Sequence, residues 1–125
     1  MRKPSSTLTP QELSIMKVVW RQDTPTVRTV YETLRKTRPI AYTTVMTMMN
    51  VLESKGYLEK KIVGKAHVYT PTKPRTQVLG AMVRDFVDRV FDGGAAALLT
   101  HLVSESGLSN KERQELRRLI DEADK

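Results

Sequence analysis

The side chains best suited to chemistry in this chain form a short stripe at helical spacing. The stripe consists of Thr43, Thr44, Met46, Thr47 and Asn50. Such side chains can contact base edges in a DNA major groove, because an asparagine amide can form two hydrogen bonds with adenine and threonine or methionine methyl groups can contact the thymine methyl. On an isolated helix, a solvated polar face would be the simpler interpretation. The surroundings of the stripe therefore decide whether these residues are candidates for base recognition.

Positive charge flanks the stripe on both sides along the chain. Cationic or titratable side chains precede and follow it at Arg35, Lys36, Arg38, Lys60, Lys61, Lys65 and His67. In protein–DNA complexes, phosphate contacts position the protein and base contacts specify the sequence. A neutral stripe within a basic surround therefore favours base recognition, with these seven residues and Tyr42 as candidate contacts to the DNA backbone.

The net charge is divided unevenly along the chain. Of the formal net charge of +7 at pH 7, residues 1–74 contribute +8, from 13 Lys and Arg against 5 Asp and Glu, and residues 75–125 contribute −1, from 8 against 9. A basic part beside a near-neutral part indicates that the first part faces a polyanion and the second has another role. We expect double-stranded DNA as the partner of the first part.

Other kinds of chemistry lack the residues that they need. The chain contains no cysteine, so disulfides, a thiolate nucleophile and cysteine metal sites are excluded. The only histidines, His67 and His101, are too few and too far apart for a metal site or a catalytic triad, and there is no glycine-rich phosphate loop. We therefore expect no cofactor, no bound metal and no enzymatic activity.

No apolar segment approaches the roughly 20 residues that span a bilayer, and none follows the basic N-terminus as a secretion signal would, so we expect a cytoplasmic protein without membrane insertion.

Two helices are expected before the stripe. Thr9 and Glu12 form the pattern of a capping box, and Pro10 suits the first helical position, so the first helix should begin at residue 10. Thr26 offers an N-cap for a second helix. We expect that helix to end at Arg38-Pro39, because the residue before a proline is pushed out of the helical region.

The stripe itself belongs to a third helix, expected from about Tyr42 to Lys55 and ended by Gly56. Its opposite face should pack against the first two helices through Val45, Met48, Met49 and Leu52. Two extended runs, residues 57–63 and 66–70, then surround Gly64-Lys65 and predict a β-hairpin with a basic tip. Three helices and a hairpin, with a short strand of uncertain position, are typical of a winged helix-turn-helix in which the hairpin is the wing.

The rest of the chain is expected to form a helical arm. After a linker bounded by Pro71 and Pro74, an apolar stripe predicts a helix that ends at Gly93-Gly94. A second helix should span residues 95–103, and a capping box beginning at Ser109 should open a third. Three short helices cannot bury all their apolar side chains alone, so we expect a homodimer. The candidate dimerisation residues are Leu79, Met82, Phe86, Val90, Phe91, Leu98, Leu102, Leu116, Leu119 and Ile120.

The predicted fold class is therefore mainly α with a small β-hairpin wing. Residues 1–74 are expected to form the winged helix-turn-helix DNA-binding domain, and residues 75–125 the C-terminal helical dimerisation domain.

The chain also resembles the penicillinase and methicillin-resistance repressors, the BlaI/MecI/CopY family of winged-helix transcriptional regulators. The resemblance is carried by residues 8–12 (LTPQE) with Trp20, by residues 41–47 (AYTTVMT), and by residues 86–94 (FVDRVFDGG) before Leu108-Ser109. It implies a homodimeric repressor of an inverted-repeat operator. It further implies a membrane sensor metalloprotease as a partner and derepression by cleavage in the C-terminal arm, at a position matching His101-Leu102. The acidic end of the chain lacks the cysteine-rich tail of copper-responsive relatives.

Two other kinds of function remain open from the residues. A winged helix can serve as a protein-interaction module, in which Thr43, Met46 and Thr47 would contact a protein, although the +8 charge of the first 74 residues argues against this. A regulator that responds to a small ligand would need an apolar pocket between the two parts of the chain, for which the short helices leave little room.

Overall fold

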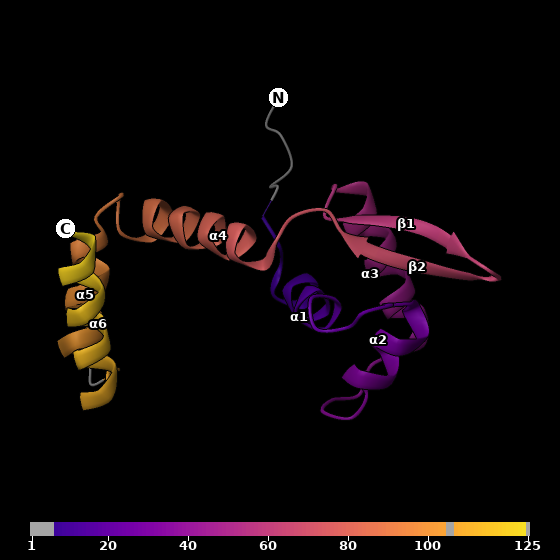
Figure 1. Ribbon diagram of the computed structural model, residues 1–125, viewed down its shortest axis with the longest axis horizontal. Helices are drawn as coiled ribbons and strands as arrows, with labels where there is room; N and C mark the ends of the chain where they lie inside the picture. Colours follow the sequence, from indigo (N-terminus) through magenta and orange to yellow (C-terminus); the bar gives the residue numbers. More distant parts are fainter. Residues whose placement is uncertain (1–6, 105–106, 125) are drawn as a thin grey trace. The chain divides into compact units, whose positions relative to one another are not determined.

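The computed structural model describes residues 7–104 and 107–124, which form helices and one β-hairpin (Figure 1). In chain order the elements are α1 (Pro10–Val19), α2 (Val27–Leu34), α3 (Tyr42–Ser54), β1 (Leu58–Val63), β2 (Ala66–Pro71), α4 (Arg75–Val90), α5 (Ala95–Ser104) and α6 (Asn110–Ala123). The chain divides into two compact units between Met82 and Val83, inside α4. The mainly α fold with a hairpin after α3 is confirmed. No helix in the described ranges is long and apolar enough to cross a membrane.

The predicted starts of α1, α2 and α6 are confirmed, and each of these three depends on a local pair of hydrogen bonds. Before α1, the Thr9 hydroxyl accepts from the Glu12 N–H at 3.2 Å, and the Glu12 carboxylate accepts from the Thr9 N–H at 2.9 Å. Thr26 caps α2 in the same way with Thr29 as its partner, and Ser109 caps α6 with Glu112. These side chains satisfy N–H groups that the first turn of a helix leaves without partners.

The predicted end of α2 is wrong by several residues. The helix ends at Leu34 rather than at Arg38-Pro39, and the next residues form a turn. In that turn the Thr37 N–H and hydroxyl both donate to the Leu34 carbonyl oxygen, at 3.1 and 3.2 Å. The constraint that a proline places on the preceding residue is satisfied by any non-helical conformation there, so it does not determine how far upstream the helix stops.

The hairpin is the only sheet in the described part of the chain, and its two strands pair antiparallel with Lys60 opposite Tyr69 and Lys61 opposite Val68. The short additional strand that we expected is not found among the described residues. In its place, the Tyr69 N–H donates a hydrogen bond of 2.8 Å to the carbonyl oxygen of Pro25, in the connection between α1 and α2. A single backbone hydrogen bond to this connection therefore stands where a strand was expected.

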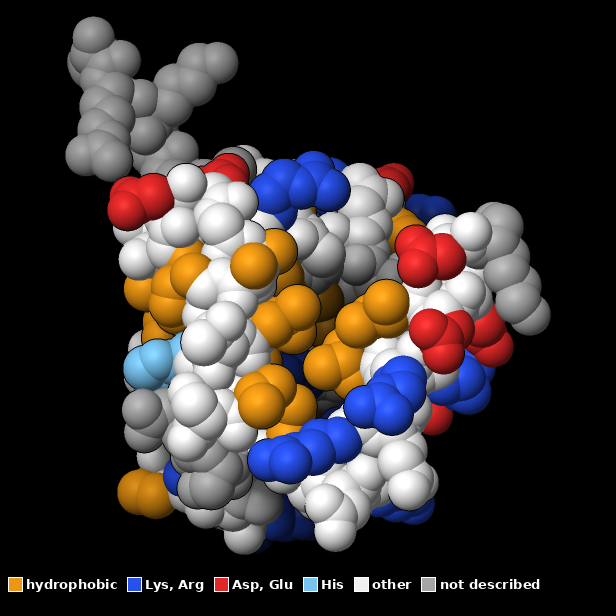
Figure 2. Space-filling model, turned by 90° about the vertical axis from the view of Figure 1, so that its left-hand side faces the viewer, with side chains coloured by type: hydrophobic (Ala, Val, Ile, Leu, Met, Phe, Trp, Pro, Cys, Tyr) orange, Lys and Arg blue, Asp and Glu red, His pale blue; other side chains and the backbone are white. Residues whose placement is uncertain are grey.

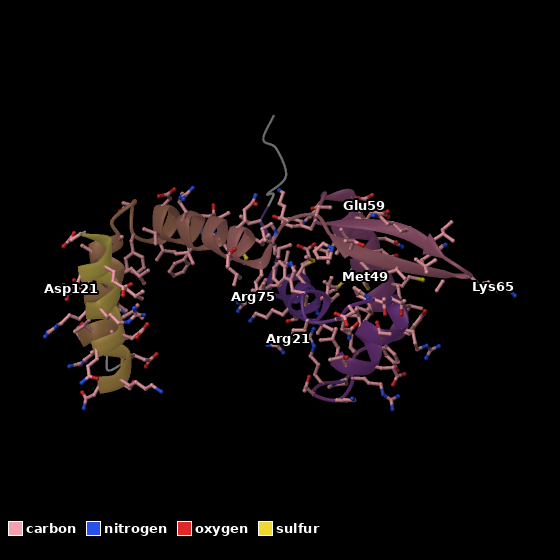
Figure 3. All side chains as sticks on the ribbon, in the orientation of Figure 1. Arg21, Met49, Glu59, Lys65, Arg75 and Asp121 are labelled. Atoms are coloured by element: carbon pink, nitrogen blue, oxygen red, sulfur yellow. The ribbon has the colours of Figure 1, made fainter. Side chains whose placement is uncertain are left out.

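The core of the first unit lies among its three helices and the hairpin, and Figure 3 shows Met49 within it. Its fully buried members are Ile15, Met16, Val19, Val30, Val45, Met49 and Leu52. The predicted inner face of α3 is confirmed, with Met48 half-buried against the same core. Val78 and Met82 of α4 also pack into this core, so the first unit extends beyond residue 74.

An ion pair between Glu12 and Lys55 links the start of α1 to the end of α3. The Glu12 side chain is buried, and its carboxylate lies 2.9 Å from the Lys55 ammonium at the end of α3. Burial alone would raise the pKa of Glu12, but the hydrogen bond from the Thr9 backbone and the Lys55 charge outweigh it and lower the pKa. Glu12 therefore both caps α1 and ties the start of α1 to the end of α3.

The second unit contains the end of α4, followed by α5 and α6. After α4, Asp92 and Gly93 adopt positive φ angles of 53° and 83°, and the Gly93 N–H donates to the Val87 carbonyl oxygen at 3.1 Å. This is the expected glycine stop of the helix. The Phe91 ring contacts the rings of Phe86 and His101, with centroids 5.9 and 6.4 Å apart.

Candidate nucleic-acid interface

The outer face of α3 presents the predicted base-reading residues to solvent. Thr43, Thr44, Met46, Thr47 and Asn50 are all exposed, and they lie opposite the buried face of the helix. Thr43, Thr44 and Thr47 line a shallow hollow with Gln11 of α1, whereas Met46 and Asn50 line a groove on the hairpin side. The stripe is therefore divided between two sides of α3, and Gln11, which the sequence analysis missed, adjoins one of them.

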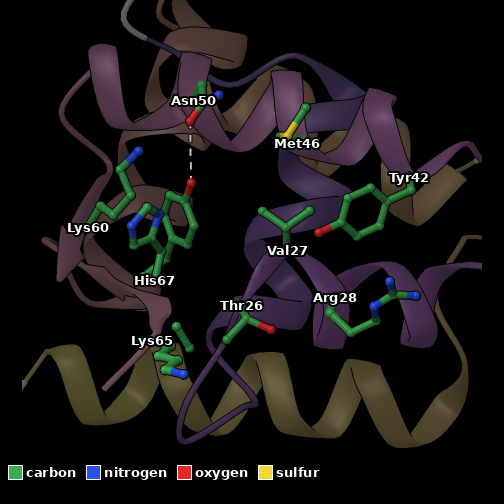
Figure 4. Close-up of a pocket in the computed structure, with 11 residues that line it drawn as sticks. Thr26, Val27, Arg28, Tyr42, Met46, Asn50, Lys60, Lys65 and His67 are labelled. Atoms are coloured by element: carbon green, nitrogen blue, oxygen red, sulfur yellow. Dashed lines mark hydrogen bonds between the residues drawn. The ribbon is translucent and has the colours of Figure 1, made fainter. Parts of the chain in front are cut away.

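The groove between α3 and the hairpin has a volume of about 380 Å³ and is shown in Figure 4. Met46 and Asn50 enter it from α3, and Lys60 and His67 enter it from the hairpin. Its other lining residues are Thr26, Val27, Arg28, Tyr42, Lys65, Ala66 and Tyr69. Uncharged side chains thus lie on the helix side of the groove and cations on the other sides.

The predicted backbone contacts are separated by the fold. Lys60, Lys65 and His67 line the groove, and Lys65 extends from the tip of the hairpin (Figure 3). Lys61 points to the other face of the hairpin, because successive residues of a strand alternate between faces.

The three cations that follow α2, Arg35, Lys36 and Arg38, do not line the groove. Arg35 lies 3.4 Å from the Glu32 carboxylate and 6.0 Å from the ring centroid of Tyr31. Lys36 is exposed, and Arg38 is half-buried. These residues form a basic end of α2 that is distinct from the groove.

Arg28 is a cation of the groove that the sequence analysis missed. Its guanidinium carbon lies 4.9 Å from the ring centroid of Tyr42, whose ring meets Tyr31 edge-on at 5.5 Å. Arg28 also forms an ion pair of 3.7 Å with Glu32, and both side chains of this pair are exposed to solvent. The signal that could have found Arg28 is its place at the start of α2, because the first helix of a helix-turn-helix crosses the DNA backbone.

The charges of the groove are only partly neutralised by the protein. Lys60 lies 3.8 Å from the Glu53 carboxylate and 5.8 Å from the ring centroid of Tyr69. Lys65 makes no ion pair with any side chain in the described ranges. Cations without a nearby carboxylate attract an external anion, so the tip of the hairpin is suited to phosphate.

The second unit exposes apolar side chains around a groove of about 330 Å³, formed by the end of α5, Leu108 and α6. Figure 2 shows hydrophobic side chains gathered around a hollow in this face, with cationic side chains beside it. The groove is lined by Val103, Leu108, Leu116 and Ile120, together with Arg113 and Arg117.

Most of the predicted dimerisation residues lie on the second unit. Of these, Phe86, Val90, Leu102, Leu119 and Ile120 are exposed, and Phe91, Leu98 and Leu116 are half-buried. Leu79 and Met82 lie in the first unit, and Met82 packs against its core. His101 and Leu102 of the predicted cleavage region lie in α5, where both side chains are exposed.

Three helices, a hairpin and a basic groove beside the exposed face of α3 define a winged helix-turn-helix domain of the DNA-binding class. Within residues 7–104 and 107–124 no group of His, Asp and Glu side chains could hold a metal ion.

Comparison with known proteins identifies the family. The profile of the family described as "Penicillinase repressor" matches residues 8–122, and the chain belongs to this family. The transcriptional regulator BlaI of Mycobacterium tuberculosis is 34% identical over 113 residues, which cover 89% of this chain and 80% of the relative. The penicillinase repressor of Bacillus licheniformis is 28% identical over 111 residues, which cover 89% of this chain and 87% of the relative. These names describe regulators and repressors, and none describes an enzyme.

Solved structures of relatives support the fold. The solution structure of the DNA-binding domain of the repressor BlaI is 31% identical, with a TM-score of 0.52, and covers 60% of this chain and 92% of its own. The solution structure of the Bacillus licheniformis BlaI monomer in complex with the blaP half-operator is 32% identical, with a TM-score of 0.50. The match covers 61% of this chain and 92% of the BlaI chain.

Proposed function

We propose that this protein is a sequence-specific transcriptional repressor that places α3 in the major groove of double-stranded DNA. The observation that carries the proposal is the groove beside α3, where Arg28, Lys60 and Lys65 surround the uncharged side chains of Met46 and Asn50. A neutral reading helix between cations is the arrangement by which helix-turn-helix proteins bind DNA. The relative solved with a half-operator supports the same use of the fold.

Each side of the interface has a distinct role in this proposal. The exposed threonines Thr43, Thr44 and Thr47 contact base edges together with Met46 and Asn50. The cations of the groove hold phosphates on one side of α3, and the basic end of α2 offers further phosphate contacts. The backbone contacts are Arg28, Arg35, Lys36, Arg38, Tyr42, Lys60, Lys61, Lys65 and His67.

The experiment that tests this proposal measures DNA affinity against salt concentration. The logarithm of the association constant should fall with the logarithm of salt concentration by about 0.9 for each phosphate that the protein neutralises. Lys65→Ala should reduce that slope by about 0.9 and weaken binding to all duplexes equally. Lys111→Ala, which removes an exposed lysine of α6, is the matched control and should leave the slope unchanged. An affinity that does not depend on salt would contradict DNA binding through this surface.

We also propose that the protein acts as a homodimer held by its second unit, on an inverted-repeat operator. The exposed apolar side chains of α6 support this, because Leu119 and Ile120 are each about half exposed and a second copy would remove them from water. Two DNA-binding units joined in this way match the symmetry of an inverted repeat.

Derepression by proteolysis is the third element of the proposal. In this proposal a membrane sensor metalloprotease is activated and leads to a cut at His101-Leu102. The cut would separate α6 from the DNA-binding unit. Because α5 is helical around this bond, cleavage requires local opening of the helix. A repressor acts on chromosomal DNA, so we place the protein in the cytoplasm.

A further inference from the structure

Tyr69 connects three segments of the first unit that lie far apart in the sequence. Its ring is buried in the core, with 2% of its surface exposed. Its N–H donates to the Pro25 carbonyl oxygen at 2.8 Å, which anchors β2 to the connection between α1 and α2. Its hydroxyl donates to the Asn50 side-chain oxygen of α3 at 3.3 Å. A hydroxyl on a buried and anchored ring can hold its acceptor in one orientation.

The acceptor of this bond is one of the candidate base-reading residues. Asn50 is exposed on α3, and Figure 4 shows its side-chain oxygen turned into the groove, with a dashed line marking the hydrogen bond. The Tyr69 hydroxyl occupies one of the two lone pairs of this oxygen and holds it towards β2, so the amide nitrogen, with its two N–H donors, is the polar atom turned away from Tyr69.

This orientation changes the base that Asn50 can recognise. A two-bond contact with adenine needs the amide oxygen to accept from adenine N6 while the nitrogen donates to N7. An amide held with its oxygen on Tyr69 and its donors turned away from that ring is instead matched by guanine, which presents the acceptors N7 and O6 in the major groove.

We infer that Tyr69 is a positioning residue that holds Asn50 as a hydrogen-bond donor, so that Asn50 selects guanine over adenine in the operator. The inference rests on the proposed function, since it assigns a specificity to the same interface. It also means that the wing contributes to base recognition through a hydrogen bond to α3, in addition to its cations.

The test compares base preferences of full-length variants on a library of duplexes randomised across the selected site. The base pair that Asn50 contacts is found first. It is the one position of the site at which Asn50→Ala loses the base preference that the wild-type protein shows. The wild-type protein should prefer guanine over adenine there by roughly tenfold. Tyr69→Phe, which keeps the ring and removes the hydroxyl, should abolish that preference at this position and leave the others unchanged. The double variant should then match Asn50→Ala.

Two further variants separate positioning from a general effect on the fold. Asn50→Asp keeps an acceptor for Tyr69 and removes the donor, so it should also lose the guanine preference. Tyr57→Phe removes a hydroxyl from another buried ring of the same unit, outside the groove, and should leave the preference intact. In the free proteins, the side-chain amide NMR signals of Asn50 should shift in Tyr69→Phe and not in Tyr57→Phe.

The outcomes distinguish this inference from the proposed function. A wild-type protein without any sequence preference would overturn both. A wild-type protein that selects a sequence but prefers adenine at the Asn50 position, or a Tyr69→Phe variant that keeps the guanine preference or weakens every position equally, would overturn the inference alone. The same holds if Asn50→Ala flattens no position.

Discussion

Replacing Glu12 with glutamine should destabilise the first unit in a way that depends on pH. The carboxylate accepts hydrogen bonds from the Thr9 N–H and from Lys55, each at 2.9 Å, and is itself buried. Glutamine has nearly the same shape and can still accept from Thr9, but it removes the charge opposite a Lys55 side chain that is only 26% exposed. A hydrogen bond between charged groups contributes about 1.5 to 3 kcal/mol, and a neutral one about half of that. We therefore expect Glu12→Gln to lower the free energy of unfolding by about 1 to 2 kcal/mol at pH 7.

The pH dependence of this loss follows from the lowered pKa of Glu12. Burial by itself raises that pKa, and the bonds from Thr9 and Lys55 more than offset it, so the pKa lies below its ordinary value of 4.5. A carboxylate with a lowered pKa contributes stability above its ordinary pKa, and that contribution disappears as pH falls through the pKa of the folded state. The difference between wild type and Glu12→Gln should therefore be full at pH 6 to 7 and shrink progressively below about pH 4.5.

Urea unfolding at a series of pH values measures this difference. Glu112→Gln is the matched control, because Glu112 occupies the same place in the capping box of α6 but is exposed and has no lysine partner among the described residues. Its effect should be much smaller. A Glu12→Gln deficit that stays constant to the lowest pH would refute the role of the ionised carboxylate. A deficit equal to that of Glu112→Gln would refute the role of Lys55.

The remaining predictions concern DNA binding and assembly. Thr47→Ala should cost about 1 to 3 kcal/mol on the operator and little on unrelated duplexes in quantitative binding assays, and equal losses on both would contradict base reading by Thr47. Truncation after His101 should dissolve the dimer in sedimentation experiments and weaken binding to a two-half-site operator by about 10² to 10⁴, whereas an undiminished affinity would exclude cleavage there as the switch. The fragment 1–82, which keeps the α4 residues that pack into the first core, should sediment as a monomer, and a dimer would place the interface in the first unit.

The parts of the fold that could be predicted depend on neighbouring residues. The starts of α1, α2 and α6 follow from capping residues three positions from their partners. The end of α3 follows from Gly56, whose φ of 86° suits a residue without a side chain. The inner face of α3 follows from its helical period. Each of these features is determined by a few residues that are close together in the sequence, so each could be predicted from the sequence alone.

The parts that could not be predicted depend on partners distant in the sequence. The bond between Tyr69 and Pro25 replaces a strand, and a single backbone hydrogen bond leaves no pattern of residue types. Arg28 joins the groove because α2 packs against α3, and the orientation of Asn50 depends on a hydroxyl from β2. An apolar stripe also does not say what it packs against, and the contact of Met82 with the first core could not be predicted from the stripe that contains it.

The wing also affects how well the protein remains in solution when it is not bound to DNA. Strand edges can pair with those of another molecule, and Ile62 and Val63, with 74% and 60% of their surfaces exposed, add apolar surface beside them. Lys60, Lys61 and Lys65 place positive charge along and beyond these strands, so two approaching wings repel each other. Neutralising all three lysines to weaken phosphate binding should therefore promote aggregation as well. The same charges that attract DNA keep free molecules of the protein apart.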